Sequence, residues 1–193
     1  GPMAPLDYDS HPWLASETEL VRQAVAERAL PTLGICLGYQ LIAQALGGSL
    51  SLLEKTEVGV VDITLNEAGK RDPLFAGLEA TSPGLQWHDW QIGELPPGAI
   101  PLAHSDGCAI QAMRAAPRAW GVQFHIETCA STVSEWLEPP GHEEELQKHL
   151  GPDAHAIFEA QAAENMARLN SDARRLFNNF TALARLPAES VEG

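Results

Sequence analysis

The sequence predicts an α/β domain in which helices flank a central sheet. Two short apolar runs, one leading into residue 36 and one at residues 120–124, are typical of buried strands, and helix-forming segments lie between and after them. The chain has 193 residues, the usual size of one domain, and its apolar fraction of 45% is ordinary for a globular protein. We therefore expect one domain with the element order helix, strand, helix, mixed strands and helices.

The first helix is predicted after residues 16–19 (Ser-Glu-Thr-Glu), which resemble a capping box. Leu20, Val21, Ala24 and Val25 give the following segment an apolar face, as expected for a helix packed on a sheet.

Residues 34–40 (Gly-Ile-Cys-Leu-Gly-Tyr-Gln) predict a tight turn from a buried strand into a second helix. Gly34 and Gly38 leave room for a backbone turn too sharp for a Cβ atom. Residues 41–46 favour a helix, and Gly47-Gly48 closes it as a C-cap.

Cys36 stands on this turn, where it is a candidate nucleophile. A cysteine at the start of a helix lies at the positive end of the helix dipole, which favours the thiolate. The same turn leaves backbone N–H groups without partners, and that of Leu37 is placed to bind an oxyanion.

The middle of the chain alternates strands and turns. Residues 58–65 alternate as a strand, with Val60, Asp62 and Thr64 on one side and Val61, Ile63 and Leu65 on the other. Turns are predicted at residues 96–98 and 105–107, and a short strand at 110–113.

His125 follows the second buried strand, at the strand end where α/β proteins place catalytic groups. Glu127, two residues further on, can accept a hydrogen bond from the imidazole and fix its tautomer. Cys36, His125 and Glu127 thus fit the roles of nucleophile, base and orienter in a catalytic triad. Without His125 and Glu127, Cys36 would be interpreted as a buried core thiol.

The helical C-terminal part covers residues 143–186. Before it, residues 131–137 predict a helix that ends at Pro139-Pro140-Gly141, and residues 143–149 read as a solvated helix face. From Asp153 to about Leu186 the chain is Ala-rich with apolar anchors, and residues 170–172 (Asn-Ser-Asp) are expected to interrupt the helix. We favour a helix packed across the domain over a partner-binding helix.

Residues 34–40 and 123–127 (Gln-Phe-His-Ile-Glu) together resemble the signature of class I, triad-type glutamine amidotransferase domains, above all the stand-alone, GMP-synthase-like members. Further segments fall in the family's order: Gly1-Pro2-Met3, Asp9 to Glu17, Glu57-x-Gly59, Gln86 to Asp89, His104 to Asp106, and Gln111-Ala112. The resemblance covers nearly the whole of residues 1–193. It implies a three-layer, flavodoxin-like, mostly parallel sheet flanked by helices, with a C-terminal helical extension.

The resemblance also implies a glutaminase. Cys36 would attack the side-chain amide of glutamine, ammonia would leave, and water would release glutamate from a γ-glutamyl thioester. His125 would act as general base and then acid, and Glu127 would orient it. The N–H groups of Leu37 and Gly1 would form the oxyanion hole. The implied substrate-binding residues are Gln40, Gln86, Trp87 and His88.

Two positions depart from the family pattern: Tyr39 stands where histidine is frequent, and Ile126 where proline is common. Neither removes a reacting group, so we interpret both as marks of a subfamily. Without the rigidity of proline, Ile126 is expected to hold Glu127 less firmly.

The start of the chain departs further, because family domains open with strands and a helix before the Gly-Gly-Pro loop in which this chain begins. We expect an upstream segment, since Gly1-Pro2-Met3 fits the family's register without a gap. The alternatives are a fragment, or a cloning scar before Met3. Central parallel strands are buried on both faces, so their true absence would predict poor stability or a compensating partner.

Composition narrows the function classes. The formal charge is −14 without a Lys/Arg cluster, which argues against nucleic-acid binding. No apolar stretch approaches a membrane span, and no secretory signal opens the chain. Three cysteines without close spacing argue against disulfides and zinc, and suit a reducing cytoplasm.

No cofactor is expected, and no ATP-binding motif occurs. The ammonia acceptor is therefore a separate synthetase subunit, or the protein acts alone on a γ-glutamyl compound; a homo-oligomer stays open.

The other candidates have structural interpretations. His88 and Asp89 are flanked by tryptophans typical of a pocket wall or core, and only the resemblance gives them a substrate-side role. His104 reads as a loop histidine rather than an alternative base. The remaining candidates are taken as inert thiols or surface histidines: Cys108, Cys129, His142, His149 and His155. A non-catalytic relative is the alternative function class, which the intact triad disfavours and the incomplete oxyanion loop favours.

Overall fold

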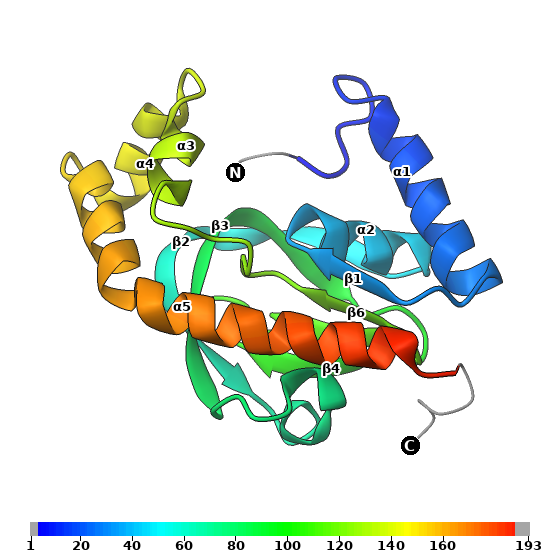
Figure 1. The fold of residues 1–193 in the computed structure, drawn as a ribbon. Helices are drawn as coiled ribbons and strands as arrows, with labels where there is room; N and C mark the ends of the chain where they lie inside the picture. Colours follow the sequence, from blue (N-terminus) through cyan, green and yellow to red (C-terminus); the bar gives the residue numbers. More distant parts are fainter. Residues whose placement is uncertain (1–3, 188–193) are drawn as a thin grey trace.

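The computed structural model describes residues 4–187 and shows a six-stranded sheet flanked by helices (Figure 1). The strands are β1 (Thr32–Ile35), β2 (Ser49–Leu65), β3 (Thr81–Glu94), β4 (Ile100–His104), β5 (Ala112–Ala116) and β6 (Ala119–Val122). The helices are α1 (Trp13–Arg22), α2 (Leu37–Ala45), α3 (Thr132–Leu137), α4 (His142–Leu150) and α5 (Ala154–Arg185). Short helical turns are η1 (Gln23–Glu27), η2 (Gly69–Arg71) and η3 (Pro73–Phe75). The predicted α/β class and the C-terminal helical extension are confirmed.

The sheet is mixed rather than mostly parallel. Its order is β1-β6-β5-β4-β2-β3, and within residues 4–187 only β1 and β6 pair in parallel, whereas the other four pairings are antiparallel. Parallel neighbours need a crossover of a dozen or more residues. The links β4–β5 and β5–β6 are too short for that, and β2 returns into β3 through η2 and η3.

The sheet separates two helical layers, which confirms the three-layer arrangement (Figure 1). On one face, Tyr39 and Ile42 of α2 and Val25 of η1 pack against Met113 and Ala119 of the sheet. On the other face, α5 crosses the strands. Its contacts there come from Leu176, Leu183 and Phe180, which pack against Ile63, Leu102, Trp120 and Val122.

Helix α5 is continuous, so the predicted interruption at residues 170–172 is wrong. Arg168 Nε donates to the Asp172 carboxylate at 2.6 Å, one helical turn on, and Leu169 and Leu176 are buried on either side of the segment. Packing and this ion pair outweigh the poor helix propensity of the three residues. The preferred interpretation of this segment, a helix packed across the domain, is confirmed.

Two further boundaries differ from the prediction. Helix α1 begins at Trp13, and residues 16–19 lie inside it without forming a cap; the Thr18 hydroxyl donates instead to the Leu14 carbonyl at 2.8 Å. Strand β2 begins at Ser49, well before Val58, directly after the predicted glycine C-cap. Among the helices of residues 4–187, none is long and apolar enough to cross a membrane.

Candidate active site

Cys36 occupies a strained turn between β1 and α2, as the sequence predicts. Its φ of 48° lies in the left-handed region, which a residue with a Cβ rarely adopts. The Cys36 N–H donates to the Val122 carbonyl at 2.9 Å, which ties the turn to the end of β6. Leu37 begins α2, so its N–H stands at the helix N-terminus beside the thiol.

Gly34 makes this turn possible. A Cβ at Gly34 would lie 2.5 Å from the Gly38 carbonyl oxygen and 2.7 Å from Cδ1 of Ile42, so no side chain fits. A Cβ at Gly38 would meet no heavy atom within 4 Å. Contrary to expectation, the turn needs only the first of the two glycines to lack a side chain.

His125 lies just beyond β6 and faces the same turn. Its N–H donates to the Leu85 carbonyl of β3 at 2.9 Å, and its ring packs edge-on against Trp136 of α3, with centroids 4.6 Å apart. Nδ1 lies 2.6 Å from Oε1 of Glu127. A carboxylate only accepts, so Nδ1 carries the proton and Nε2 is left for proton exchange with Cys36.

Ile126 strengthens the placement of Glu127, which corrects the expectation drawn from the missing proline. The backbone N–H of Ile126 donates to Oε2 of Glu127 at 2.9 Å. Proline has no N–H and would not supply this bond. Both oxygens of the carboxylate are therefore held, although the side chain is about half exposed (54%).

The three groups shift one another's ionisation. Burial alone would raise the pKa of Cys36, but the hydrogen bond and charge of His125 outweigh it and hold the pKa below the usual value of 9.0. Burial would lower the pKa of His125, yet Cys36 and Glu127 raise it to about 9. Within residues 4–187, the buried Nε2 of His125 has no hydrogen-bond partner at ideal distance and angle. Hydrogen bonds between catalytic groups are often long or poorly aligned until substrate binds. The shifts favour a thiolate–imidazolium pair.

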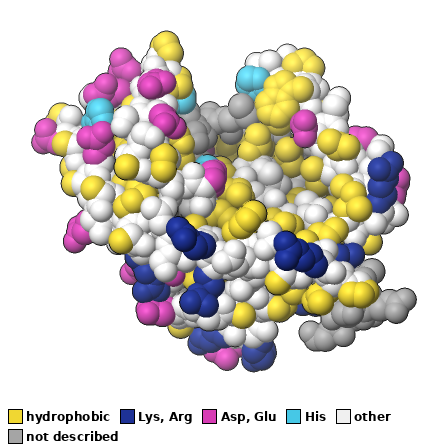
Figure 2. Space-filling model, in the orientation of Figure 1, with side chains coloured by type: hydrophobic (Ala, Val, Ile, Leu, Met, Phe, Trp, Pro, Cys, Tyr) yellow, Lys and Arg dark blue, Asp and Glu magenta, His cyan; other side chains and the backbone are white. Residues whose placement is uncertain are grey.

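An open cleft of about 580 Å³ lies over this pair. Figure 2 shows the molecule hollowed between the α3–α4 segment and the N-terminal segment before α1. The lining residues are Ala4, Asp7, His11, Ile35, Cys36, Leu37, Gln40, His88, Asp89, Trp90, His125 and His142. Among these there are two carboxylates and no Lys or Arg. This volume falls within the roughly 300–1,000 Å³ of ordinary small-molecule sites.

The predicted substrate-binding residues divide into two groups. Gln40 and His88 line the cleft, whereas Gln86 and Trp87 do not, which corrects that expectation. Gln86 is fully buried and its Nε2 donates to Glu57 Oε2 at 3.0 Å, while the Trp87 ring packs among the helices, 5.6 Å from that of His142. Side chains alternate along a strand, so Trp87 points away from the face of β3 that carries Gln86 and His88. Gln86 shares that face but is held in the buried network around Glu57.

A buried polar network centred on Glu57 supports the cleft wall. Oε2 of Glu57 accepts from Gln86 and Gln111 and lies 3.0 Å from Nε2 of His88; Oε1 accepts from Ser105 at 2.5 Å. Burial raises the pKa of Glu57, but these bonds outweigh it and lower the pKa overall. The other His88 nitrogen, Nδ1, lies 2.9 Å from the Trp90 carbonyl. Both neighbours are hydrogen-bond acceptors, so the ring is held between them.

Several site residues escaped the sequence analysis. His142 lines the cleft, although it was expected at the surface, and Asp7 and His11 do so too. Gln123 is fully buried and donates from Nε2 to the Cys36 sulphur at 3.4 Å. A glutamine inside the apolar run at 120–124 was the available signal, because a buried amide needs partners.

Tyr39 belongs to the core rather than to the site. It is fully buried, its hydroxyl donates to the Ile110 carbonyl at 2.8 Å, and its ring fills the space at Gly121, where a Cβ would lie 2.5 Å from Cδ2. The departure from histidine at this position leaves the reacting groups unchanged.

The other candidate groups lie outside the cleft. His104 is exposed at the end of β4, and burial raises the pKa of Cys108 to about 11. Cys129 is exposed, and the hydroxyls of Ser131 and Thr132 lower its pKa. Gly1 lies outside the described residues. Residues 4–187 contain no cluster of His, Cys, Asp or Glu suited to a metal ion.

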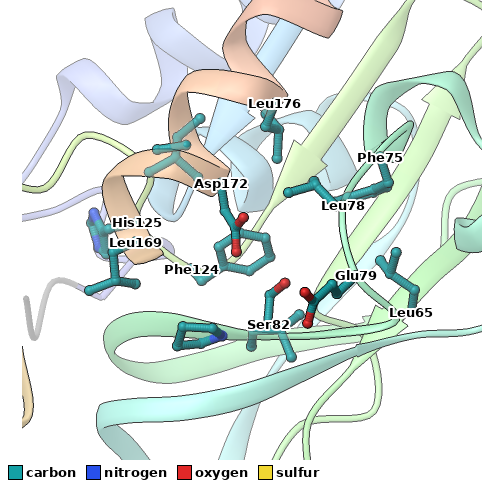
Figure 3. Close-up of a pocket in the computed structure, with 14 residues that line it drawn as sticks. Leu65, Phe75, Leu78, Glu79, Ser82, Phe124, His125, Leu169, Asp172 and Leu176 are labelled. Carbon is teal, nitrogen blue, oxygen red and sulfur yellow. The ribbon is translucent and has the colours of Figure 1, made fainter. Parts of the chain in front are cut away.

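A second, apolar cavity of about 30 Å³ lies behind His125, between α5 and the β2–β3 hairpin (Figure 3). Leu169, Leu176 and Phe124 form part of its wall. Its polar rim, made by Glu79, Ser82 and Asp172, is bridged by Arg168, which contacts all three. His125 also lines this small apolar cavity, which we interpret as a packing seam that supports the His125 segment.

The chain is similar to known proteins in both sequence and fold. The family model described as glutamine amidotransferase class-I matches residues 1–138. The chain is 32% identical over 166 residues to the glutamine amidotransferase-like protein YfeJ of Salmonella typhimurium, covering 86% of this chain and 68% of that protein. It is 39% identical over 118 residues to a protein of Pyrococcus abyssi named as one of the subunits of glutamine-hydrolysing GMP synthase, covering 61% of each. The crystal structure of a glutamine amidotransferase from Thermotoga maritima superimposes with a TM-score of 0.78 at 27% identity, covering 96% of this chain and 76% of that one.

Proposed function

The chain belongs to the glutamine amidotransferase class-I family, and on that premise we propose that it hydrolyses the side-chain amide of glutamine through a thioester on Cys36. The main support for this proposal is that the strained Cys36 turn faces His125, whose Nδ1 lies 2.6 Å from Oε1 of Glu127. This combination supplies a nucleophile, a proton carrier and an orienter at one end of the sheet.

The proposed reaction uses the thiolate–imidazolium pair in two steps. The Cys36 thiolate attacks the amide carbon, and the Leu37 N–H stabilises the oxyanion that forms. His125 gives its proton to the leaving nitrogen, and ammonia departs. Neutral His125 then takes a proton from water, the hydroxide adds to the thioester carbon, and the C–S bond breaks to release glutamate and restore the thiolate. In the family pattern, the Gly1 N–H would supply the second oxyanion donor.

The substrate side of the cleft is proposed to be formed by Gln40, His88 and Asp89. The Asp89 side chain lines the cleft and accepts a hydrogen bond from the Thr56 hydroxyl. Its carboxylate is suited to the α-ammonium group of glutamine, because the described lining offers no competing cation.

A second candidate substrate class is favoured by the size of the cleft. A volume of about 580 Å³ leaves room beyond glutamine itself, so γ-glutamyl amides with larger leaving groups are included in the proposal. The ammonia acceptor is proposed to be a separate synthetase, since the Pyrococcus relative is named as one part of a multi-chain GMP synthase. A reducing, cytoplasmic location belongs to the same proposal, because an oxidised Cys36 is no nucleophile.

The deciding experiment measures glutamate release from glutamine by the purified chain, alone and with candidate γ-glutamyl amides. A covalent glutamine analogue should label Cys36 and no other cysteine. Release from glutamine alone supports a stand-alone glutaminase, and release only from a larger amide supports the second substrate class. If the full-length protein shows no glutamate release and no labelling, the non-catalytic relative becomes the better interpretation.

A further inference from the structure

We propose that Gln123 donates a hydrogen bond to the sulphur of Cys36 and holds it as a thiolate, and that Gln40 acts as a positioning residue that fixes the Gln123 amide for this role. The inference rests on the proposed function only in taking Cys36 as the nucleophile. It concerns the resting protein, before any substrate binds.

The geometry begins with a short, buried contact. Nε2 of Gln123 lies 3.4 Å from Sγ of Cys36, a normal separation for a hydrogen bond to a large sulphur atom. Gln123 is fully buried, and its backbone N–H donates to the Gln111 carbonyl at 2.8 Å. The backbone from which its side chain starts is therefore fixed by the neighbouring chain segment.

The orientation of the Gln123 amide follows from its other partners. Nε2 of Gln40 donates both to the Trp90 carbonyl, at 3.1 Å, and to Oε1 of Gln123, at 3.0 Å. A backbone carbonyl can only accept, so the nitrogen of Gln40 must face Trp90. The oxygen of Gln123 must then face Gln40, which leaves its nitrogen toward Cys36. Turning either amide over would oppose two donors or two acceptors.

This chain of bonds is anchored away from the nucleophile. The Trp90 carbonyl also contacts Nδ1 of His88 at 2.9 Å, and Nε2 of His88 lies 3.0 Å from the Glu57 carboxylate. Gln40, His88 and Glu57 are each at most 9% exposed. The Gln123 amide is thus the last member of a buried relay with few alternative arrangements.

A donor at this place favours the charged sulphur. A thiolate is a far better acceptor than a thiol, and a hydrogen bond to the charged form of a group stabilises that form. Burial removes water that would otherwise solvate the thiolate, and the Gln123 N–H replaces part of that solvation. His125 supplies the opposite charge, so the two residues act on Cys36 from separate positions.

The test measures the rate at which iodoacetamide alkylates Cys36 between about pH 5 and 10, where thiols titrate. The Cys36 peptide is quantified by mass spectrometry, and exposed Cys129 in the same sample serves as reference. Gln123→Met keeps the side-chain length and removes the donor. Loss of a hydrogen bond to a charged group should raise the Cys36 inflexion by roughly one to two pH units and slow alkylation below it about 10- to 100-fold. The Cys129 rates should not change.

Gln111→Met is the matched control. Gln111 is also fully buried and contributes the carbonyl to which the Gln123 N–H donates, but its amide donates to Glu57 and Ser105 rather than to sulphur. This variant should shift the Cys36 inflexion far less than Gln123→Met, because it reaches the sulphur only through Glu57 at the far end of the relay. Gln40→Met should shift the inflexion upward by less than Gln123→Met, because Gln123 still reaches the sulphur but loses its orientation.

The inference is overturned if folded Gln123→Met keeps the wild-type inflexion, or if Gln111→Met shifts it equally. If thermal unfolding shows that Gln123→Met does not fold, Gln40→Met decides, and an unshifted inflexion there overturns the inference. Alkylation is measured without glutamine, so its result does not depend on glutaminase activity. A chain that releases no glutamate would contradict the proposed function but not the role of Gln123.

Discussion

The Nδ1 atom of His125 lies 2.6 Å from the Oε1 atom of Glu127, and the whole contact lies within three consecutive residues. The intervening Ile126 holds the other carboxylate oxygen through its backbone N–H. Such a local arrangement fixes the histidine tautomer without help from a distant element. Its dependence on one half-exposed carboxylate makes it directly testable.

Replacing Glu127 by Gln should lower the turnover of glutamine by about 10- to 100-fold, within the range of general acid–base contributions. The amide oxygen can still accept from Nδ1, but the charge that stabilises the imidazolium is lost. Steady-state glutaminase assays at saturating glutamine provide the measurement. Glu138→Gln, an exposed position just after α3, is the control and should retain wild-type turnover. Full turnover by Glu127→Gln would contradict the role assigned to Glu127.

Cys36→Ala should abolish both glutamate release and labelling by a covalent glutamine analogue, because no other described thiol lines the cleft. Intact-protein mass spectrometry detects the adduct. Cys129→Ala is the matched control: it removes an exposed thiol with a lowered pKa and should leave labelling intact. An adduct that persists in Cys36→Ala and disappears in Cys129→Ala would identify Cys129 as the nucleophile and contradict the proposal.

The pH profile of kcat/KM for glutamine should be bell-shaped. On the acid side activity falls as the thiolate is protonated, with an inflexion below the usual thiol value of 9.0. On the alkaline side it falls as His125, whose pKa is raised to about 9, loses the proton that ammonia needs. Because the two groups interact, both inflexions belong to the pair. Alkylation by iodoacetamide needs no acid and should rise to a plateau instead. Activity that keeps rising above pH 9 would exclude a protonated His125 as the acid.

Glu57→Gln should lower the free energy of unfolding by about 1–3 kcal/mol, the cost of leaving a buried donor unsatisfied. An amide in place of the carboxylate opposes its own N–H₂ to a site already filled with donors from Ser105, Gln86 and Gln111. Urea denaturation measures the loss, and Glu54→Gln at an exposed position of the same strand is the control. The folded-state pKa of Glu57 is lowered, so its contribution is complete above the usual value of 4.5 and is lost as the pH falls through the folded value. A difference from wild type that persists undiminished in acid would contradict this account.

The sequence was most informative where function and local geometry coincide. Cys36, His125 and Glu127 were predicted because the turn at 34–40 and the spacing at 125–127 are local patterns. The relay through Gln123 and Gln40 was not predicted, because its members are 83 residues apart and meet only in the folded sheet. The same limit explains the error at Gln86 and Trp87: Gln86 is held by Glu57 of β2 and Trp87 packs among the C-terminal helices, and both contacts form only in the folded chain.

The mostly parallel sheet was implied by the family resemblance, and the sequence pattern itself could not test it. Apolar periodicity reports how deeply a strand is buried, not which neighbour it pairs with, and only the β1–β6 pairing runs parallel among the described strands. In α5, residues 170–172 have weak helix propensity, yet tertiary contacts by Leu169 and Leu176 keep the helix continuous.

The two glycines of the Cys36 turn should respond oppositely to alanine. In Gly34→Ala the new Cβ would lie 2.5 Å from a backbone oxygen, which cannot move without shifting α2, so a loss of at least about 1–3 kcal/mol is expected. Gly38→Ala meets open space inside α2, where alanine is the better helix former by up to about 1 kcal/mol, so stability should be equal or higher. Thermal unfolding of both variants, with wild type alongside, gives the comparison. Equal destabilisation by both variants would contradict this account. It would mean that the backbone conformation of the turn, rather than the space around the Cβ position of Gly34, requires glycine.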